Sequence, residues 1–176
     1  PFLAVIWFHN VHTPLGKNQE LMKQYADCSV KEQIYYSNIT AVDTQVGALR
    51  KALRELGVAD DTMVWFTSDN GPHYEGGHQP GFFNSKGPLK GHKRDLYEGG
   101  IRVPGLLVWP RKIKKPLTVT APCVTSDYFP TILDALGIDL PADRAYDGAS
   151  LLPFVLGQRK EREKPIGFLN REGKEA

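Results

Sequence analysis

An aspartate and an asparagine follow closely on a short apolar segment in the middle of the 176-residue chain. Residues 63–66 read Met-Val-Trp-Phe, and Asp69, Asn70 and Gly71 come shortly afterwards. In open α/β sheets the chemistry lies in loops at the carboxyl ends of strands. Ca²⁺ accepts oxygen ligands from carboxylates and amides, so Asp69 and Asn70 could form half of a cation site. The same residues are strong turn formers, and a plain turn is the alternative interpretation.

Ammonium and imidazole groups form a second set of candidates. Lys93 lies in the basic run Lys-Gly-His-Lys-Arg at residues 90–94, close in sequence to the cation candidates. His9 and His12 lie just after an apolar run at residues 2–8. Such groups can face an anionic substrate and stabilise developing negative charge. The alternatives are a solvated lysine and histidines that satisfy local hydrogen bonds.

In the first half of the chain, the sequence predicts one strand and one long helix that would position these residues. Residues 2–8 are uniformly apolar, as expected for a strand buried on both faces. Residues 32–56 show helical periodicity, and Gly57 supplies a C-terminal cap. The expected apolar stripe of this helix consists of Val42, Val46, Leu49, Leu53 and Leu56.

From residue 63 onward, the sequence predicts strands at residues 63–66 and 105–109, with a helix further on. The paired Gly99 and Gly100 before the second strand indicate a tight backbone crossing. Asp127 is a plausible N-cap for a helix that ends at Gly137. Residues 147–153 turn into a short apolar helix, and strands that alternate with helices indicate an α/β fold. The expected buried face of the helix comprises Tyr128, Ile132, Leu133 and Leu136.

Composition and charge restrict the functional classes. The chain is 41% hydrophobic and 24% charged, which is ordinary for a globular domain with a substantial core. A formal net charge of +2 is too small to indicate a nucleic-acid partner. No stretch approaches the length of a membrane span. The two cysteines, Cys28 and Cys123, form neither a metal-binding spacing nor a disulfide framework.

Taken in order, these segments resemble the sulfatase family of the alkaline-phosphatase-like superfamily. The matching pieces are residues 2–14, ending in His-Thr-Pro; residues 36–57; residues 66–71; Lys93 with residues 97–104; and residues 127–137 with 147–153. Each piece alone is weak, but the ordered set is specific. The resemblance implies an α/β fold with a mixed β-sheet flanked by helices.

The resemblance also implies roles for individual residues. Asp69 and Asn70 would be ligands of one Ca²⁺ ion, and His12 and Lys93 would contact the sulfate group and the leaving oxygen. Residues between these two sets are candidates for recognising a sugar or aryl group, or are ordinary loop residues: His73, Tyr74 and His78.

One part of the family pattern is missing. The family nucleophile is a cysteine or serine in a Cys-x-Pro-x-Arg-like motif, converted to formylglycine, and neither Cys28 nor Cys123 stands in such a motif. We therefore expect the nucleophile and the remaining Ca²⁺ ligands upstream, with this chain as the C-terminal half of the catalytic domain. The expected division is residues 1–158 for the catalytic portion and 159–176 for the start of a truncated C-terminal segment.

The resemblance predicts hydrolysis of carbohydrate or aryl sulfate esters by a periplasmic, secreted or lysosomal enzyme. A phosphate or phosphonate ester hydrolase of the same superfamily is one alternative. Asn70 favours Ca²⁺ and sulfate, because related zinc phosphatases tend to carry histidine at this place and imidazole suits Zn²⁺. A module that binds sulfated glycans without cleaving them is the other alternative.

Overall fold

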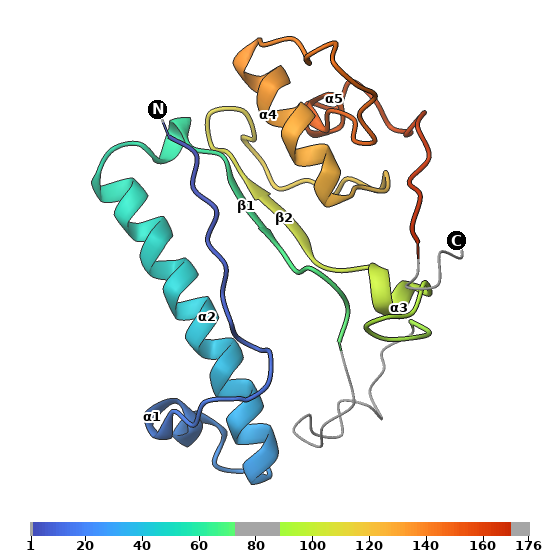
Figure 1. The fold of residues 1–176 in the computed structure, drawn as a ribbon. Coiled ribbons are helices and arrows are strands. Elements are labelled where there is room, and N and C mark those ends of the chain that lie inside the picture. The colour runs from blue at the N-terminus through green and yellow to red at the C-terminus, as the bar shows by residue number, and fades with distance from the viewer. Residues whose placement is uncertain (1, 73–88, 170–176) are drawn as a thin grey trace. The chain divides into compact units, whose positions relative to one another are not determined.

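The computed structural model describes residues 2–72 and 89–169 of the chain (Figure 1). These residues form two compact units. The first unit comprises residues 1–59 and 70–102, and the second comprises residues 60–69 and 103–176. The expected division at residues 158 and 159 stays a prediction. Within the described ranges, no helix is both long and apolar enough to cross a bilayer.

The first unit is built on α2 (Val30–Glu55), the long helix in Figure 1. It begins in a capping box, because the Ser29 side chain accepts from the Glu32 N–H and the Glu32 carboxylate accepts from the Ser29 N–H. It ends where Gly57 adopts a φ of 70° and donates to the Arg54 carbonyl at 3.0 Å. The helix predicted for residues 32–56, with its glycine cap, is therefore confirmed.

Two short helical segments, α1 (Gln19–Met22) and a 3₁₀ turn (Lys23–Tyr25), pack against α2. A buried amide strengthens this connection, since Asn38 Nδ2 donates to the Gly16 carbonyl at 2.8 Å. Of the expected apolar stripe, Leu53 is buried, but Leu56 is 74% exposed, so its predicted burial is wrong. Leu56 lies at the C-cap, where the helix no longer presents a continuous face.

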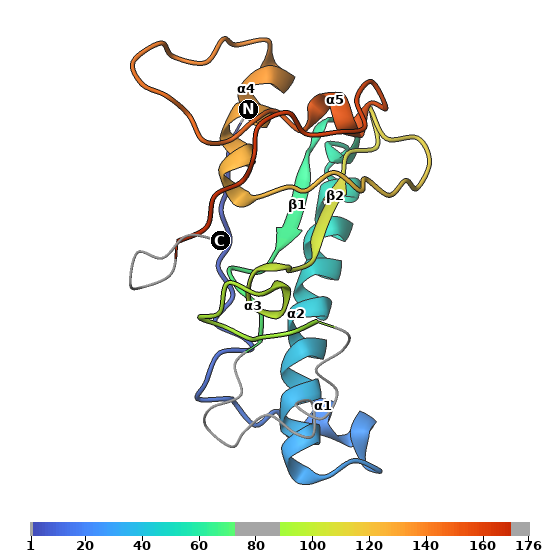
Figure 2. The same ribbon diagram turned by 90° about the vertical axis from the view of Figure 1, so that its right-hand side faces the viewer.

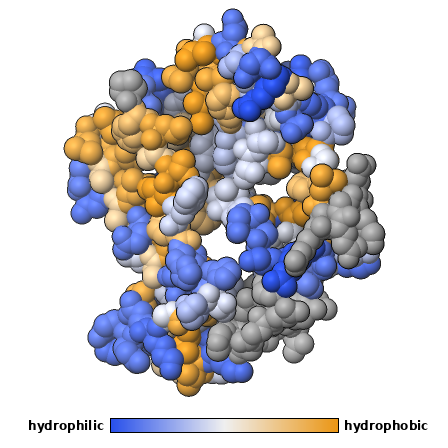
Figure 3. Space-filling view, viewed as in Figure 1, coloured by the Kyte–Doolittle hydropathy of each residue, from blue (hydrophilic) through white to orange (hydrophobic). Residues whose placement is uncertain are grey.

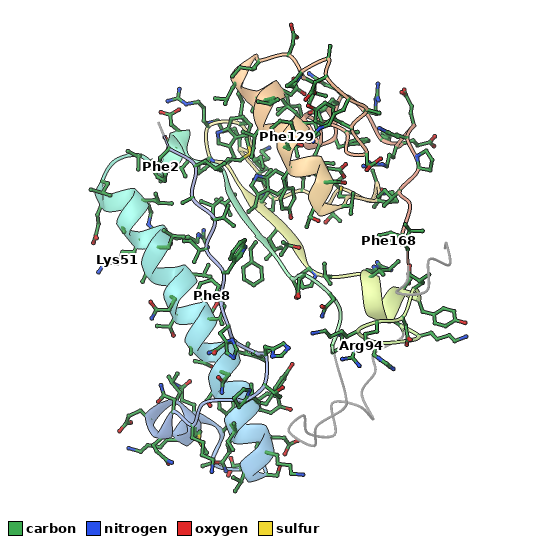
Figure 4. All side chains as sticks on the ribbon, viewed as in Figure 1. Phe2, Phe8, Lys51, Arg94, Phe129 and Phe168 are labelled. Atoms are coloured by element: carbon green, nitrogen blue, oxygen red, sulfur yellow. The ribbon has the colours of Figure 1, made fainter. Side chains whose placement is uncertain are left out.

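Residues 2–8 do not form the buried strand expected from their composition. They have no strand assignment in the structure, and their apolar side chains are largely exposed, including Phe2 at 77% and Trp7 at 90%. Phe2 and Phe8, both labelled in Figure 4, mark the ends of this segment. A strand needs backbone partners as well as apolar side chains. Among the described residues, only β1 and β2 pair with one another.

The second unit contains that pair. β1 (Val64–Thr67) runs antiparallel to β2 (Gly105–Val108), with Val64 opposite Val108 and Thr67 opposite Gly105. Figures 1 and 2 both show the strands side by side. The two strands predicted from the sequence are confirmed to within one residue at each end. The register brings the end of β1 level with the start of β2.

Two helices complete the second unit, α4 (Tyr128–Leu136) and α5 (Leu152–Val155). Gly137 ends α4 with a φ of 68°, as predicted. A small core of Ala121, Leu151 and Phe154 packs with Trp65 of β1. Pro130 and Thr131 are the buried residues of α4, whereas Leu136 is 65% exposed, contrary to expectation. Hydrophobic residues are also exposed on the surface, as Figure 3 shows for one face of the molecule.

Candidate functional site

The predicted cation ligands follow β1 closely. β1 ends at Thr67, and Asp69 is exposed while Asn70 is partly buried. Asn70 Nδ2 donates to the Gly71 carbonyl at 2.8 Å, and this bond orients the amide with its oxygen as the acceptor atom. The Ser68 hydroxyl lies 3.5 Å from Asp69 Oδ1. Asp69 and Asn70 therefore present a carboxylate and a defined amide just beyond a strand end.

Backbone hydrogen bonds join the segment after Asn70 to the loop that carries Lys93. The Lys93 N–H donates to the Pro72 carbonyl at 2.7 Å, and the Gly71 N–H donates to the Gly100 carbonyl at 2.8 Å. Gly100 belongs to α3 (Glu98–Ile101), the single helical turn that follows the lysine loop. Arg94, which is labelled in Figure 4, marks the position of that loop. The structure thus brings together two sequence-predicted segments, those of Asn70 and Lys93.

Four glycines make this junction possible, and we call Gly71, Gly91, Gly99 and Gly100 the glycine crossing. A Cβ atom on Gly71 would lie 1.9 Å from the Gly99 carbonyl oxygen, and one on Gly99 would lie 2.3 Å from the Gly91 oxygen. Gly91 also has a φ of 86°, which other residues rarely adopt. The predicted tight crossing at residues 99 and 100 is confirmed, because any side chain there would separate the backbones.

Lys93 itself is partly buried, and its ammonium group makes no hydrogen bond or ion pair with the described residues. Nearby Lys90 differs, since its ammonium lies 3.9 Å from the centroid of the Tyr97 ring. Burial without an opposite charge is unfavourable for a cation. An anion beside the ammonium of Lys93 would offset this cost.

His12 lies in a turn of the first unit, where its N–H donates to the His9 carbonyl at 2.9 Å. Its Nδ1 lies 2.7 Å from the Thr13 carbonyl oxygen and donates to it when protonated. The His9 and His12 rings are 5.8 Å apart between centroids. No hydrogen bond in the described structure joins His12 to Asn70 or Lys93, so the predicted grouping of all three stays a prediction.

Three predicted substrate contacts, His73, Tyr74 and His78, lie outside the described residues. The structure adds two residues that sequence reasoning did not select. Asp95 accepts a hydrogen bond from the His92 N–H at 3.1 Å, and both flank Lys93. The available sequence signal was an aspartate directly after the basic run at residues 90–94.

The donor set at residues 69 and 70 fits part of a Ca²⁺ site. Ca²⁺ takes about six to eight oxygen ligands, and Asp69 and Asn70 offer a carboxylate and an amide oxygen. In the ranges that the structure describes, no group of three or more His, Cys, Asp or Glu side chains could hold a metal. Further ligands would therefore have to join these two residues.

Cys123 does not have the environment of an activated nucleophile. Cys123 Sγ donates to the Ala121 carbonyl at 3.2 Å. Cys123 as a whole residue is exposed, but partial burial of its thiol, and secondarily the negative charge of Asp127, raises the pKa of Cys123, while Arg162 opposes the shift. A raised pKa keeps the group as a thiol at neutral pH, and the thiol is the weak nucleophile.

Comparisons with known proteins agree on one family. The family profile described as Sulfatase matches residues 1–138. Human steryl-sulfatase is 39% identical over 174 residues, covering 97% of this chain and 29% of its own length. Human arylsulfatase H is 36% identical over 172 residues, covering 96% of this chain and 29% of its own length.

A solved structure agrees with these relatives. Ps i-CgsB, crystallised in complex with k-i-k-neocarrahexaose, superposes with a TM-score of 0.79 at 29% identity, covering 92% of this chain and 35% of that one. The likeness confirms the expected α/β fold class of the alkaline-phosphatase-like superfamily. The chain spans 29% of the length of both relatives, so it corresponds to one part of each.

Proposed function

Since the chain belongs to the sulfatase family, we propose that it supplies part of the active site of an enzyme that hydrolyses sulfate monoesters. The observation that carries this proposal is the environment of Lys93. Its ammonium is partly buried, has no acidic partner among the described residues, and is tied by its own backbone to the segment of Asn70.

The charge of Lys93 suits two steps of ester cleavage. In the ground state, an ammonium attracts the sulfate monoanion. As the S–O bond breaks, negative charge moves to the bridging oxygen, where Lys93 stabilises it and can donate a proton. His12 is the second proposed donor. When Nδ1 donates to the Thr13 carbonyl, only the doubly protonated ring also carries a proton on Nε2, and in that form Nε2 can donate to a substrate oxygen.

Asp69 and Asn70 are the proposed contribution of this chain to a Ca²⁺ site, as their oxygen donors allow. A Ca²⁺ ion held there would supply positive charge to stabilise the anionic sulfate group. Formylglycine would supply the nucleophile, and we propose that it lies outside this chain, because neither cysteine stands in the required motif. The chain alone therefore contains an anion-binding part of the reaction machinery.

We propose a carbohydrate or aryl sulfate as the substrate. The similarity to human arylsulfatase H supports an aryl ester. The similarity to Ps i-CgsB, which was solved with an oligosaccharide, supports a glycan. His73, Tyr74 and His78 are the proposed selectors between these classes. A periplasmic, secreted or lysosomal location is part of the same proposal.

The test uses the natural protein that carries this chain, produced together with a formylglycine-generating enzyme. Hydrolysis of 4-nitrophenyl sulfate and 4-nitrophenyl phosphate is compared under identical conditions, with sulfated oligosaccharides as further substrates. We expect preferential sulfate release. Lys93→Ala should lower kcat/KM by about 10²-fold or more, as for the loss of other groups that stabilise a transition state.

Lys51→Ala is the control, because Lys51 is an exposed lysine of α2 (Figure 4) that pairs with the exposed Glu55. It should leave kcat/KM unchanged. Preferential phosphate release would assign the protein to the phosphatase side of the superfamily. Tight binding of sulfated glycans without release of sulfate would instead identify a binding module.

A further inference from the structure

We propose that His92 and Asp95 are positioning residues that fix the peptide backbone of Lys93 and thereby the place of its ammonium group. The inference rests on the proposed role of Lys93 in sulfate ester cleavage. It follows from a small network of hydrogen bonds made by His92, which precedes Lys93 in the chain, and Asp95, which follows it. Neither residue is proposed to touch the substrate.

The first part of the network is a tight turn closed by Asp95. The Asp95 N–H donates to the His92 carbonyl at 2.9 Å. In the opposite direction, Asp95 Oδ2 accepts from the His92 N–H at 3.1 Å. These two bonds form a reciprocal pair that spans Lys93 and Arg94. Both side chains are partly shielded, at 26% exposed for His92 and 37% for Asp95.

The second part is the His92 ring, which bridges two oxygen atoms. Its Nδ1 lies 2.7 Å from the Lys93 carbonyl oxygen, and its Nε2 lies 3.4 Å from Asp95 Oδ2. A proton on Nδ1 is donated to the Lys93 carbonyl. When Nε2 also carries a proton, the Asp95 carboxylate attracts it and orients the ring, in the way that a carboxylate orients other functional imidazoles.

Lys93 is consequently held at both backbone polar groups. Its carbonyl faces the His92 ring, and its N–H donates to the Pro72 carbonyl at 2.7 Å. The second bond links it to the segment of Asn70, so Asp95 helps to set the spacing between the ammonium and the amide. Gly91 makes room for the network, because a Cβ there would lie 3.1 Å from Asp95 Oδ2.

A network of this kind predicts an effect on catalysis that passes through Lys93. A misplacement of about 1 Å in a catalytic group can lower a rate by about 10²-fold. We expect Asp95→Ala to lower kcat of the natural protein on 4-nitrophenyl sulfate by about 10- to 100-fold, with a smaller change in KM. Asp95→Asn retains an oxygen acceptor for the His92 N–H and should restore most of kcat.

A double-mutant cycle distinguishes positioning from general destabilisation. If Asp95 acts through Lys93, Asp95→Ala should lower kcat/KM by less than about threefold when Lys93 is already alanine. Additive losses in the double variant would overturn the proposal. Glu20→Ala is the matched control, since Glu20 and Lys23 form another pair three residues apart in the same unit, but an exposed one. It should leave kcat unchanged in either background.

A second measurement does not depend on activity. Hydrogen exchange followed by mass spectrometry should show the segment 90–95 exchanging about tenfold faster or more in Asp95→Ala, with the exchange of α2 unchanged. Unchanged exchange in this segment would overturn the positioning role whatever the enzyme cleaves. Faster exchange in a protein that cleaves no sulfate ester would retain the positioning role and refute the proposed function.

Discussion

The guanidinium of Arg162 binds both carboxylate oxygens of Asp127, with two N–O distances of 2.8 Å. The Asp127 side chain is fully buried, and that of Arg162 is 5% exposed. The same carboxylate accepts from the N–H groups of Val124 and Ala149, each at 2.8 Å. The hydrogen bond to Asp127 is the main cause that raises the pKa of Arg162. One carboxylate therefore ties three separate segments of the second unit.

Removing the arginine should destabilise this unit strongly. Arg162→Ala would leave the buried Asp127 charge without its partner, and breaking such a pair typically costs about 3–5 kcal/mol. Urea unfolding measures the loss. Arg159→Ala is the matched control, because Arg159 pairs with Glu163 at the surface and its loss should cost less than about 1 kcal/mol. Equal effects of the two variants would show that burial does not strengthen the Asp127 pair.

The thiol of Cys123 should react slowly at neutral pH. Its raised pKa means that the reactive thiolate forms only at higher pH than in a free cysteine, whose pKa is about 8.5. The rate of alkylation by iodoacetamide, measured against pH in a Cys28→Ser background, should have its midpoint above that value. A midpoint at or below the value for free cysteine would contradict the role assigned to burial of the thiol.

The capping box of α2 should contribute stability that depends on pH. Hydrogen bonds from the Ser29 side chain and backbone lower the pKa of Glu32. A lowered pKa means that the contribution is present above the unfolded pKa of about 4.3 and is lost as pH falls through the folded value. The stability difference between the wild type and Glu32→Gln should therefore shrink in acid, as followed by helix circular dichroism during urea titration.

The Ser29 hydroxyl of the same capping box should also stabilise α2. Ser29→Ala removes the acceptor for the Glu32 N–H and should destabilise the protein by about 1 kcal/mol. Ser29→Thr retains a hydroxyl and serves as the control. Equal stability of the alanine and threonine variants would show that the hydroxyl contributes nothing to the start of α2.

The proposed Ca²⁺ ligands can be tested without measuring catalysis. In the natural protein, Ca²⁺ added after chelation should raise the melting temperature, because a ligand that binds only the folded state stabilises it. Asp69→Ala and Asn70→Ala should each reduce that rise, whereas Asp139→Ala, which changes another exposed aspartate, should retain it. A full rise in both ligand variants would exclude residues 69 and 70 from the site.

The features that the sequence predicted well are those determined by neighbouring residues. α2 and α4 were expected where they lie, because periodicity and the glycines at 57 and 137 are local signals. The pairing of Gly99 and Gly100 likewise predicted a close backbone approach. It did not identify the opposing chain, since the partner Gly71 lies 28 residues earlier.

The features that the sequence missed depend on distant partners. Residues 2–8 have the composition of a buried strand, but composition does not specify which backbone will pair with them. Asp127 is the N-cap residue of α4 as expected, but its side chain makes no capping hydrogen bond there. Its carboxylate instead accepts from Ala149 and Arg162, which lie 22 and 35 positions further along the chain. The network around Lys93 was missed because the acceptor on Asp95 acts on the main chain, which has no pattern in the sequence.

The glycine crossing has a consequence for how this site can change over generations or in the laboratory. A pocket lined by side chains can be remodelled by exchanging one residue at a time. At Gly71 and Gly99 there is no side chain to exchange, and even alanine must move main-chain atoms. Substitutions are therefore tolerated more easily around the glycine crossing than within it. The distance between the backbones of Asn70 and Lys93 should accordingly change little. Mutant libraries built around the proposed site should therefore leave these glycines fixed.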